Sequence, residues 1–132
     1  MIMKENKILI KIKRPISEVF DFVITPTNTS KWIASIVEEK TDKWPVKIGT
    51  VYRNKNKDGV WSEYKLTEFK KNKSFTMSQK GTSYRVRYIF KSLGDKLTEM
   101  TYFEWVETGD LEDPFSKGTL NNLKKIMEQK KV

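Results

Sequence analysis

Few side chains in this sequence could carry out acid–base or nucleophilic chemistry. The chain of 132 residues contains neither histidine nor cysteine. The usual general base, the thiol nucleophile and the common transition-metal ligands are therefore missing. Acid–base work would fall to Glu99 or a tyrosine, and a serine or lysine nucleophile has no evident partner. This inventory favours binding over catalysis, and we expect no catalytic residue, no metal and no cofactor.

The composition indicates one globular domain over residues 1–132. Hydrophobic residues make up 37% of the chain and aromatic residues 12%, which is ordinary for a globular protein. The longest apolar runs are too short to span a membrane, and residues 1–7 lack the apolar stretch of a signal peptide. We therefore expect a cytoplasmic protein without a membrane span, either a monomer or a homodimer.

The net charge of +9 raises the question of a nucleic-acid partner, because a basic surface attracts phosphate. The lysines are scattered along the chain and interleaved with acidic residues. No Arg-rich stripe and no nucleic-acid-binding motif is present in the sequence. The charge pattern therefore argues against nucleic acid as the partner.

The elements that must position a site begin with strands and two short helices. Arg14-Pro15 ends a first alternating segment, and Thr25-Pro26 ends an apolar helical pattern over residues 16–23. A second short helix, which Asn28 could cap, carries Trp32. Turn signals then separate alternating segments, as in an antiparallel meander. The predicted strands cover residues 7–13, 35–40, 50–56, 60–69, 74–79, 83–92 and 97–106.

A long amphipathic helix is predicted at the end of the chain, from Asp113 to Lys131. Asp113 is a suitable N-cap and Pro114 suits the first helical position. Apolar residues recur at spacings of three and four. They are Phe115, Leu120, Leu123, Ile126 and Met127. A helix of this length needs a sheet or cavity of similar length to cover its apolar stripe.

The hairpin turns predict which side chains face this helix, because residues opposite each other on neighbouring strands share a face. A two-residue turn at Gly94-Asp95 would place Tyr88 opposite Thr101 and Val86 opposite Phe103. Turns near residues 58, 70 and 80 extend the same face across the meander. The predicted face comprises Val51, Arg53, Tyr64, Leu66, Phe75, Met77, Gln79, Tyr84, Val86, Tyr88, Phe90, Glu99, Thr101, Phe103 and Trp105.

This predicted face mixes aromatic rings with hydroxyls, an amide and two charged groups, unlike a plain hydrophobic core. An apolar cavity with a few polar groups is the usual form of a small-molecule site. Arg53 could bind a ligand carboxylate and Glu99 a ligand donor. The alternative is that both are solvated at the rim, since one bulge would turn either outward.

The order of elements resembles the helix-grip fold of the START-like, or SRPBCC, superfamily, and in particular its polyketide cyclase/dehydrase and lipid-transport branch. The segments that carry the resemblance are Arg14–Val23, Asn28 with Trp32, Val46–Thr50, Leu66–Phe69 and Leu120–Lys124. The resemblance implies a curved antiparallel sheet of six to seven strands around the last helix. It also implies a cavity between sheet and helix that holds a hydrophobic ligand.

We therefore expect an α+β helix-grip domain that binds a small apolar or amphipathic molecule, with transport or sequestration as its role. The ligand-binding residues would be those of the predicted face from Arg53 to Trp105. A cyclase or dehydratase using the same pocket is one alternative. A partner-binding module with a filled interior is the other, and it would show an exposed apolar patch.

Overall fold

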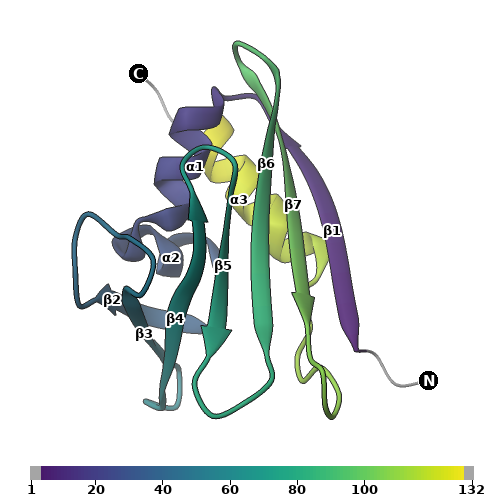
Figure 1. The fold of residues 1–132 in the computed structure, drawn as a ribbon. Helices are drawn as coiled ribbons and strands as arrows, with labels where there is room; N and C mark the ends of the chain where they lie inside the picture. Colours follow the sequence, from purple (N-terminus) through teal and green to yellow (C-terminus); the bar gives the residue numbers. More distant parts are fainter. Residues whose placement is uncertain (1–3, 130–132) are drawn as a thin grey trace.

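The computed structural model describes residues 4–129, which form a curved antiparallel sheet covered on one face by helices (Figure 1). The seven strands lie in the order β1-β7-β6-β5-β4-β3-β2. The elements are β1 Glu5–Ile12, α1 Ile16–Ile24, α2 Pro26–Trp32, β2 Ile36–Thr41, β3 Val51–Asn56, β4 Trp61–Lys70, β5 Ser74–Gln79, β6 Arg85–Gly94, β7 Leu97–Trp105 and α3 Lys117–Gln129. The predicted α+β helix-grip architecture is confirmed.

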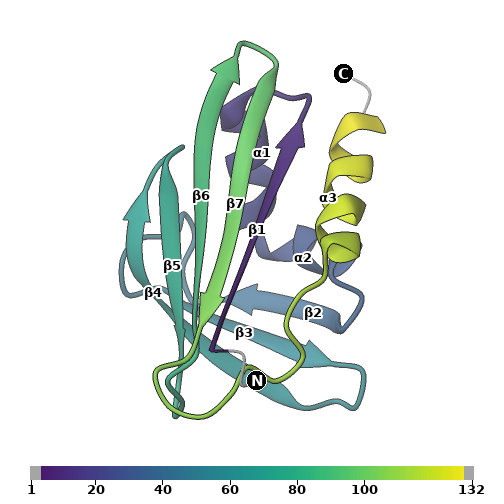
Figure 2. The ribbon, with the colours of Figure 1, turned by 90° about the vertical axis from the view of Figure 1, so that its right-hand side faces the viewer.

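The three helices lie on the concave side of the sheet (Figure 2). β2 and β3 curl beneath α2, so that the sheet wraps around the helices rather than lying flat against them (Figure 2). β1 and β2 are the two edge strands. None of the helices between residues 4 and 129 is long and apolar enough to cross a membrane.

The short helices meet at a proline, as the sequence predicts, but their capping differs. Thr25 precedes α2 and Pro26 is its first residue, where a missing N–H costs nothing. Asn28, predicted as the cap, lies inside α2, and its side-chain amide donates to the Phe22 carbonyl over 3.2 Å. Asn28 therefore fastens α2 to the end of α1 instead of starting a helix.

The last helix starts later than predicted, at Lys117 rather than Asp113. Asp113 has φ of +54°, outside the helical region. The Phe115 N–H, which an Asp113 cap could have accepted, donates instead to a carboxylate on β7. Ser116 supplies the cap, through its hydroxyl and the Thr119 N–H. Residues 130 and 131 of the predicted helix lie outside the described residues.

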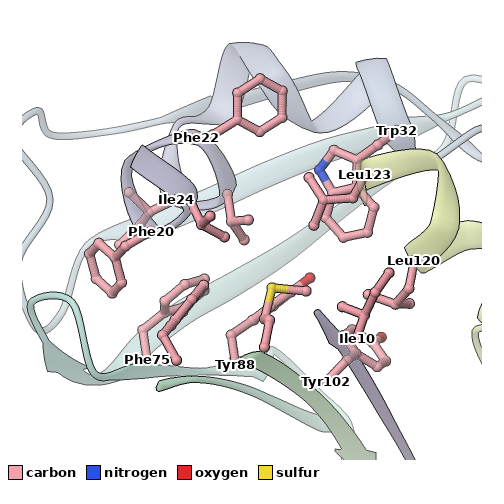
Figure 3. Packing of buried hydrophobic residues seen from close by; sticks show 14 of the residues in the cluster. Ile10, Phe20, Phe22, Ile24, Trp32, Phe75, Tyr88, Tyr102, Leu120 and Leu123 are labelled. Carbon is pink, nitrogen blue, oxygen red and sulfur yellow. The ribbon is translucent and has the colours of Figure 1, made fainter. Parts of the chain in front are cut away.

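The core fills the interior beneath α1 and α3 (Figure 3). Leu120, Leu123 and Met127 of α3 are fully buried. Under α1, the Phe20 ring meets Phe75 edge-on at 5.8 Å between ring centres and Phe90 at 5.1 Å. The described part of α3 therefore seals the core with aliphatic side chains.

The predicted register of β6 and β7 is wrong by one residue. Tyr88 lies opposite Tyr102 and Val86 opposite Glu104. An irregularity between Ser92 and Gly94 adds one residue to β6, and a one-residue shift exchanges the two faces of the partner strand. The concave side of β7 therefore carries Thr98, Met100, Tyr102 and Glu104, and its convex side carries the predicted site residues Glu99, Thr101, Phe103 and Trp105.

The register of β3 and β4 is also shifted by one residue from the prediction. Tyr64 lies opposite Tyr52, whereas Arg53 pairs with Glu63 on the convex side. The β4–β5 register agrees with the prediction for Tyr64 and Leu66, with Leu66 opposite Met77, and an irregularity between Leu66 and Glu68 shifts the later pairs by one residue. Because an odd shift inverts a strand and an even shift does not, β3 is turned over while β4 and β5 keep their predicted face.

Candidate functional site

A cavity of about 670 Å³ lies between the concave sheet, α2 and the segment 106–115 that leads to α3. Its walls come from strands β2 to β7, from α2, and from Val23 at the end of α1. This volume is within the range of roughly 300–1,000 Å³ that small-molecule sites occupy. The fold therefore leaves room for a ligand beneath α2, next to the packed core beneath α1.

Half of the predicted site residues line this cavity. They are Tyr64, Phe75, Met77, Gln79, Tyr84, Val86 and Tyr88, from β4, β5, β6 and the turn before β6. Leu66 and Phe90 face the same side but belong to the packed core. Contact of the lining residues with a ligand stays a prediction.

The other predicted residues lie on the convex side, which corrects their assignment as cavity lining. Arg53 donates to Glu63 over 3.1 Å and is exposed. Phe103 and Trp105 stack on each other at 5.0 Å between ring centres. Glu99 and Thr101 project from the same side of β7, opposite Lys91 and Ile89 of β6.

Glu104 is a buried carboxylate in the cavity wall, and the sequence prediction missed it. Its exposed fraction is 1%. One carboxylate oxygen accepts hydrogen bonds from the hydroxyls of Tyr84, at 2.7 Å, and Tyr102, at 3.2 Å. The other accepts from the Asn6 amide at 2.9 Å and the Phe115 N–H at 2.8 Å. Four donors, from β1, β7, the turn before β6 and the 106–115 segment, therefore surround this carboxylate, close to the most that it can accept.

Glu39 is a second acidic residue of the cavity that sequence reasoning missed. It lies on β2 opposite Asn54 of β3, whose side-chain amide donates to it over 3.2 Å. The Thr29 hydroxyl of α2 donates to its other oxygen over 2.5 Å. Burial raises the pKa of the Glu39 carboxyl, and these two hydrogen bonds partly oppose the rise. Strict alternation from Ile36 would have turned Glu39 outward, but an irregularity between Ile36 and Glu38 brings both Ile36 and Glu39 to the cavity.

Four tyrosines line the cavity, Tyr64, Tyr84, Tyr88 and Tyr102. Burial raises the pKa of Tyr64 to about 12, and the carboxylates of Glu39 and Glu104 add to the rise. Burial and the same two carboxylates raise the pKa of Tyr88. Within residues 4–129, neither hydroxyl has a hydrogen-bond partner, whereas Tyr84 and Tyr102 are held by Glu104. The Tyr64 and Tyr88 hydroxyls are neutral and available to a ligand.

Trp32 contributes a buried donor to the cavity lining. Its side chain is 2% exposed, and its indole N–H has no hydrogen-bond partner within the described chain. The ring meets Phe115 edge-on at 6.3 Å between centres, and Phe115 in turn stacks on Tyr102 at 4.5 Å. Figure 3 shows the indole nitrogen turned away from α3, toward the interior between the helices and the sheet. A buried donor without a partner is costly, so this N–H is a candidate contact for a ligand acceptor.

Comparison with protein families identifies the group to which this fold and cavity belong. The model of the polyketide cyclase/dehydrase and lipid transport family matches residues 7–130. The chain belongs to this family. The resemblance drawn from Arg14–Val23 and the later segments is thereby confirmed. A comparison with curated proteins found no match.

Solved structures agree with this family fold over nearly the whole chain. XoxI from Bacillus cereus superposes with a TM-score of 0.76 at 15% identity, covering 96% of this chain and 97% of that one. The Aha1 dimer from Colwellia psychrerythraea gives 0.69 at 14% identity, with 96% and 98% covered. The di-domain ARO/CYC BexL of the BE-7585A biosynthetic pathway gives 0.67 at 15% identity, with 96% of this chain matching 50% of that one. At these identities the likeness extends to the fold alone.

This family member also has an uneven charge distribution around its cavity. The lining includes the acidic residues Glu39, Glu104, Asp110, Glu112 and Asp113. Among the described residues that line it there is no lysine or arginine, although the chain carries a net charge of +9. No group of three or more acidic side chains in the described part of the chain is arranged to hold a metal ion. The cavity is therefore acidic within a basic protein.

Proposed function

We propose that this chain binds a small, mostly apolar molecule in the cavity beneath α2, as a carrier or sequestering protein. The observation that carries the proposal is the cavity of about 670 Å³, whose walls combine aromatic rings with unpartnered polar groups. A filled core would have cost less, because side chains facing empty space lose their packing contacts. Membership of a family described by lipid transport supports the same proposal.

The position of the proposed site differs from the sequence expectation. A cavity under the C-terminal helix was expected, but none of the described residues of α3 lines it. The covering elements are α2 and the segment 106–115, which places Phe115 over the cavity. The ligand would therefore be enclosed by residues that precede α3.

The two alternative functions have less support. Acid–base work in a cyclase or dehydratase was expected to fall to Glu99 or a tyrosine. Glu99, like Arg53, lies on the convex side of the sheet, which leaves only the tyrosines of the cavity for this role. A partner-binding module was expected to have a filled interior, which the cavity volume opposes. The family description names polyketide cyclase/dehydrase beside lipid transport, so the choice of binding over the first alternative depends on the residues of the cavity.

The binding proposal can be tested with a variant that fills the cavity. Val86 lines the cavity and is 6% exposed, so Val86→Trp would occupy space that a ligand needs. Ile89→Trp on the same strand is the matched control, because Ile89 is 39% exposed on the convex side. The measurements are native mass spectra of protein purified from its own cells and titration with Nile red, a neutral apolar dye.

The expected result is an apolar companion in the native spectra and dye binding by the wild type. Ile89→Trp should keep the dye affinity, and Val86→Trp should lower it by about tenfold or more. Tyr88→Ala, which enlarges the same cavity, should change the affinity as well. Equal dye affinity in all four proteins would refute the proposal, as would a wild type that binds neither a companion nor the dye.

A further inference from the structure

The cavity's charge points to the chemical class of its ligand. Glu39 and Glu104 line the interior, and Asp110, Glu112 and Asp113 lie in the exposed covering segment. Within the described lining no basic side chain offsets them. A ligand carboxylate or phosphate would meet only like charge there, whereas a cation would be attracted. The acidic group once expected on the ligand depended on Arg53, which lies outside the cavity.

Glu39 has the free acceptor capacity that a cation needs, and Glu104 does not. Glu104 already accepts four hydrogen bonds, whereas Glu39 accepts one on each oxygen, from Thr29 and Asn54. A carboxylate can accept about four hydrogen bonds, so roughly two positions on Glu39 remain open. No lysine or arginine of the described chain pairs with Glu39. Its charge therefore lacks the partner that a half-buried carboxylate usually has.

The pKa values of the cavity tyrosines show that the negative charges of Glu39 and Glu104 extend across the interior. The pKa of Tyr64 is raised by both Glu39 and Glu104 in addition to burial. The same negative field that opposes a phenolate at Tyr64 and Tyr88 opposes any ligand anion. It stabilises a ligand cation by the same physics.

Two further features of the walls suit a ligand that carries a cation and a separate oxygen acceptor on an apolar body. Trp32 is only 2% exposed, and its indole N–H lacks an acceptor and faces the interior (Figure 3). Thr29, which holds Glu39, lies one helical turn before Trp32 on α2, so that both side chains reach the same region. Tyr64, Tyr88 and Trp32 also present rings that attract cations.

We propose that the cavity binds a protonated amine carried on an apolar, ring-sized body, with the ammonium group against Glu39 and an oxygen acceptor at the Trp32 N–H. This inference rests on the proposed ligand-binding function and specifies its ligand class. An ammonium group would donate to the open positions on Glu39. The apolar body would lie along Phe75, Met77 and Val86.

The test uses three probes that share one apolar body and carry a cationic, a neutral or an anionic side group. Each is a 6-methoxynaphthalene whose 2-position carries an aminoethyl, a hydroxyethyl or a carboxymethyl group. At pH 7.5 the first is cationic, the second neutral and the third anionic. Affinities are measured by calorimetry for the wild type, Glu39→Gln, Glu39→Asp and Glu38→Gln. Glu38 is the matched control, because it neighbours Glu39 but pairs with Lys55 outside the cavity.

The expected result is that the amine binds at least about tenfold more tightly than the alcohol, and that the acid binds most weakly, as for a half-buried ion pair. Glu39→Gln should bring the amine and alcohol to within about threefold. Glu39→Asp should keep part of the preference, and Glu38→Gln should keep all of it. In ¹H–¹⁵N spectra, the indole signal of Trp32 should move on binding and that of the exposed Trp61 should not.

Several outcomes would overturn the inference, and they separate it from the proposed function. Binding of the alcohol without a preference for the amine, or a preference that survives in Glu39→Gln, refutes the amine assignment and leaves the binding function in place. A static Trp32 signal in a saturated amine complex refutes the acceptor contact. Failure of all three probes, together with failure of the dye titration above, refutes both proposals.

Discussion

Replacing Glu104 by glutamine should destabilise the fold, although it removes a buried charge. Glu104 is 1% exposed, and no lysine or arginine of the described chain forms an ion pair with it. Two effects therefore compete. Loss of the charge removes a desolvation cost, which would stabilise the variant. Loss of acceptor capacity leaves donors unpaired, which would destabilise it.

The hydrogen-bond geometry decides which effect is larger. All four groups around Glu104 are donors: the hydroxyls of Tyr84 and Tyr102, the Asn6 amide and the Phe115 N–H. A glutamine keeps one acceptor oxygen but turns an NH₂ group toward the other pair of donors. Each donor left unsatisfied costs about 1–3 kcal/mol. After the relief of desolvation we expect a net loss of about 3 kcal/mol in the free energy of unfolding.

Urea unfolding followed by circular dichroism measures this loss. With a denaturant slope of about 1.5 kcal/mol per molar, a domain of this size should lose roughly 2 M in its midpoint. Glu99→Gln is the control, because this substitution removes the same charge from the convex side of the same strand. The control should stay within about 0.5 kcal/mol. A midpoint for Glu104→Gln equal to or above that of the wild type would refute the reasoning. It would show that the relief of the desolvation cost is at least as large as the cost of the unpaired donors.

Three further predictions follow from the burial of single side chains. The pKa of Glu39 is raised, so its carboxyl contributes stability below about pH 4 that is lost as pH rises through the folded-state pKa. In urea unfolding, Glu39→Gln should therefore gain stability relative to the wild type as the pH rises from 4 to 7. The control Glu38→Gln should not show this gain. The pKa of Tyr64 is raised to about 12, so the native protein should lose stability from about pH 10 to pH 12, and Tyr64→Phe should lose less. Ultraviolet titration, which follows tyrosine ionisation, would contradict this if the two proteins showed no difference near pH 12. Leu123→Ala should cost about 2–5 kcal/mol, because Leu123 is fully buried in α3, whereas Lys125→Ala on the exposed side should cost less than about 0.5 kcal/mol; equal thermal midpoints of the two variants would show that α3 does not seal the core.

Local signals were sufficient to predict the elements of this fold. Alternation and turn residues located every strand, and Thr25-Pro26 separated the two short helices. The start of α3 was misplaced because Asp113-Pro114 is a good local signal for a helix start. A contact distant in sequence overrides it, since the Phe115 N–H donates to Glu104. A cap can be predicted from its neighbours in sequence only when tertiary structure does not use the same N–H.

The site depended on register, which local signals fix less well. The predicted two-residue turn at Gly94-Asp95 would also place Glu104 opposite Arg85, on the side of the sheet that faces solvent. Both faces of β7 carry aromatic residues, Tyr102 on one side and Phe103 with Trp105 on the other. Hydrophobic alternation therefore gave no means of choosing between the faces. The predicted site residues of β4, β5 and β6 were assigned to the correct side because the shifts between their own pairs were zero or even.

The irregularity between Ser92 and Gly94 also affects how residues are compared among relatives of this chain. A relative with one residue fewer at this hairpin could keep every residue of β7 and still present Trp105, rather than Glu104, to its cavity. At identities near 15%, the place where an alignment opens its gap decides whether a residue is assigned to the pocket or to the surface. Divergence of ligand preference in such proteins can therefore arise from an insertion or deletion in a surface turn, without any substitution in the pocket itself.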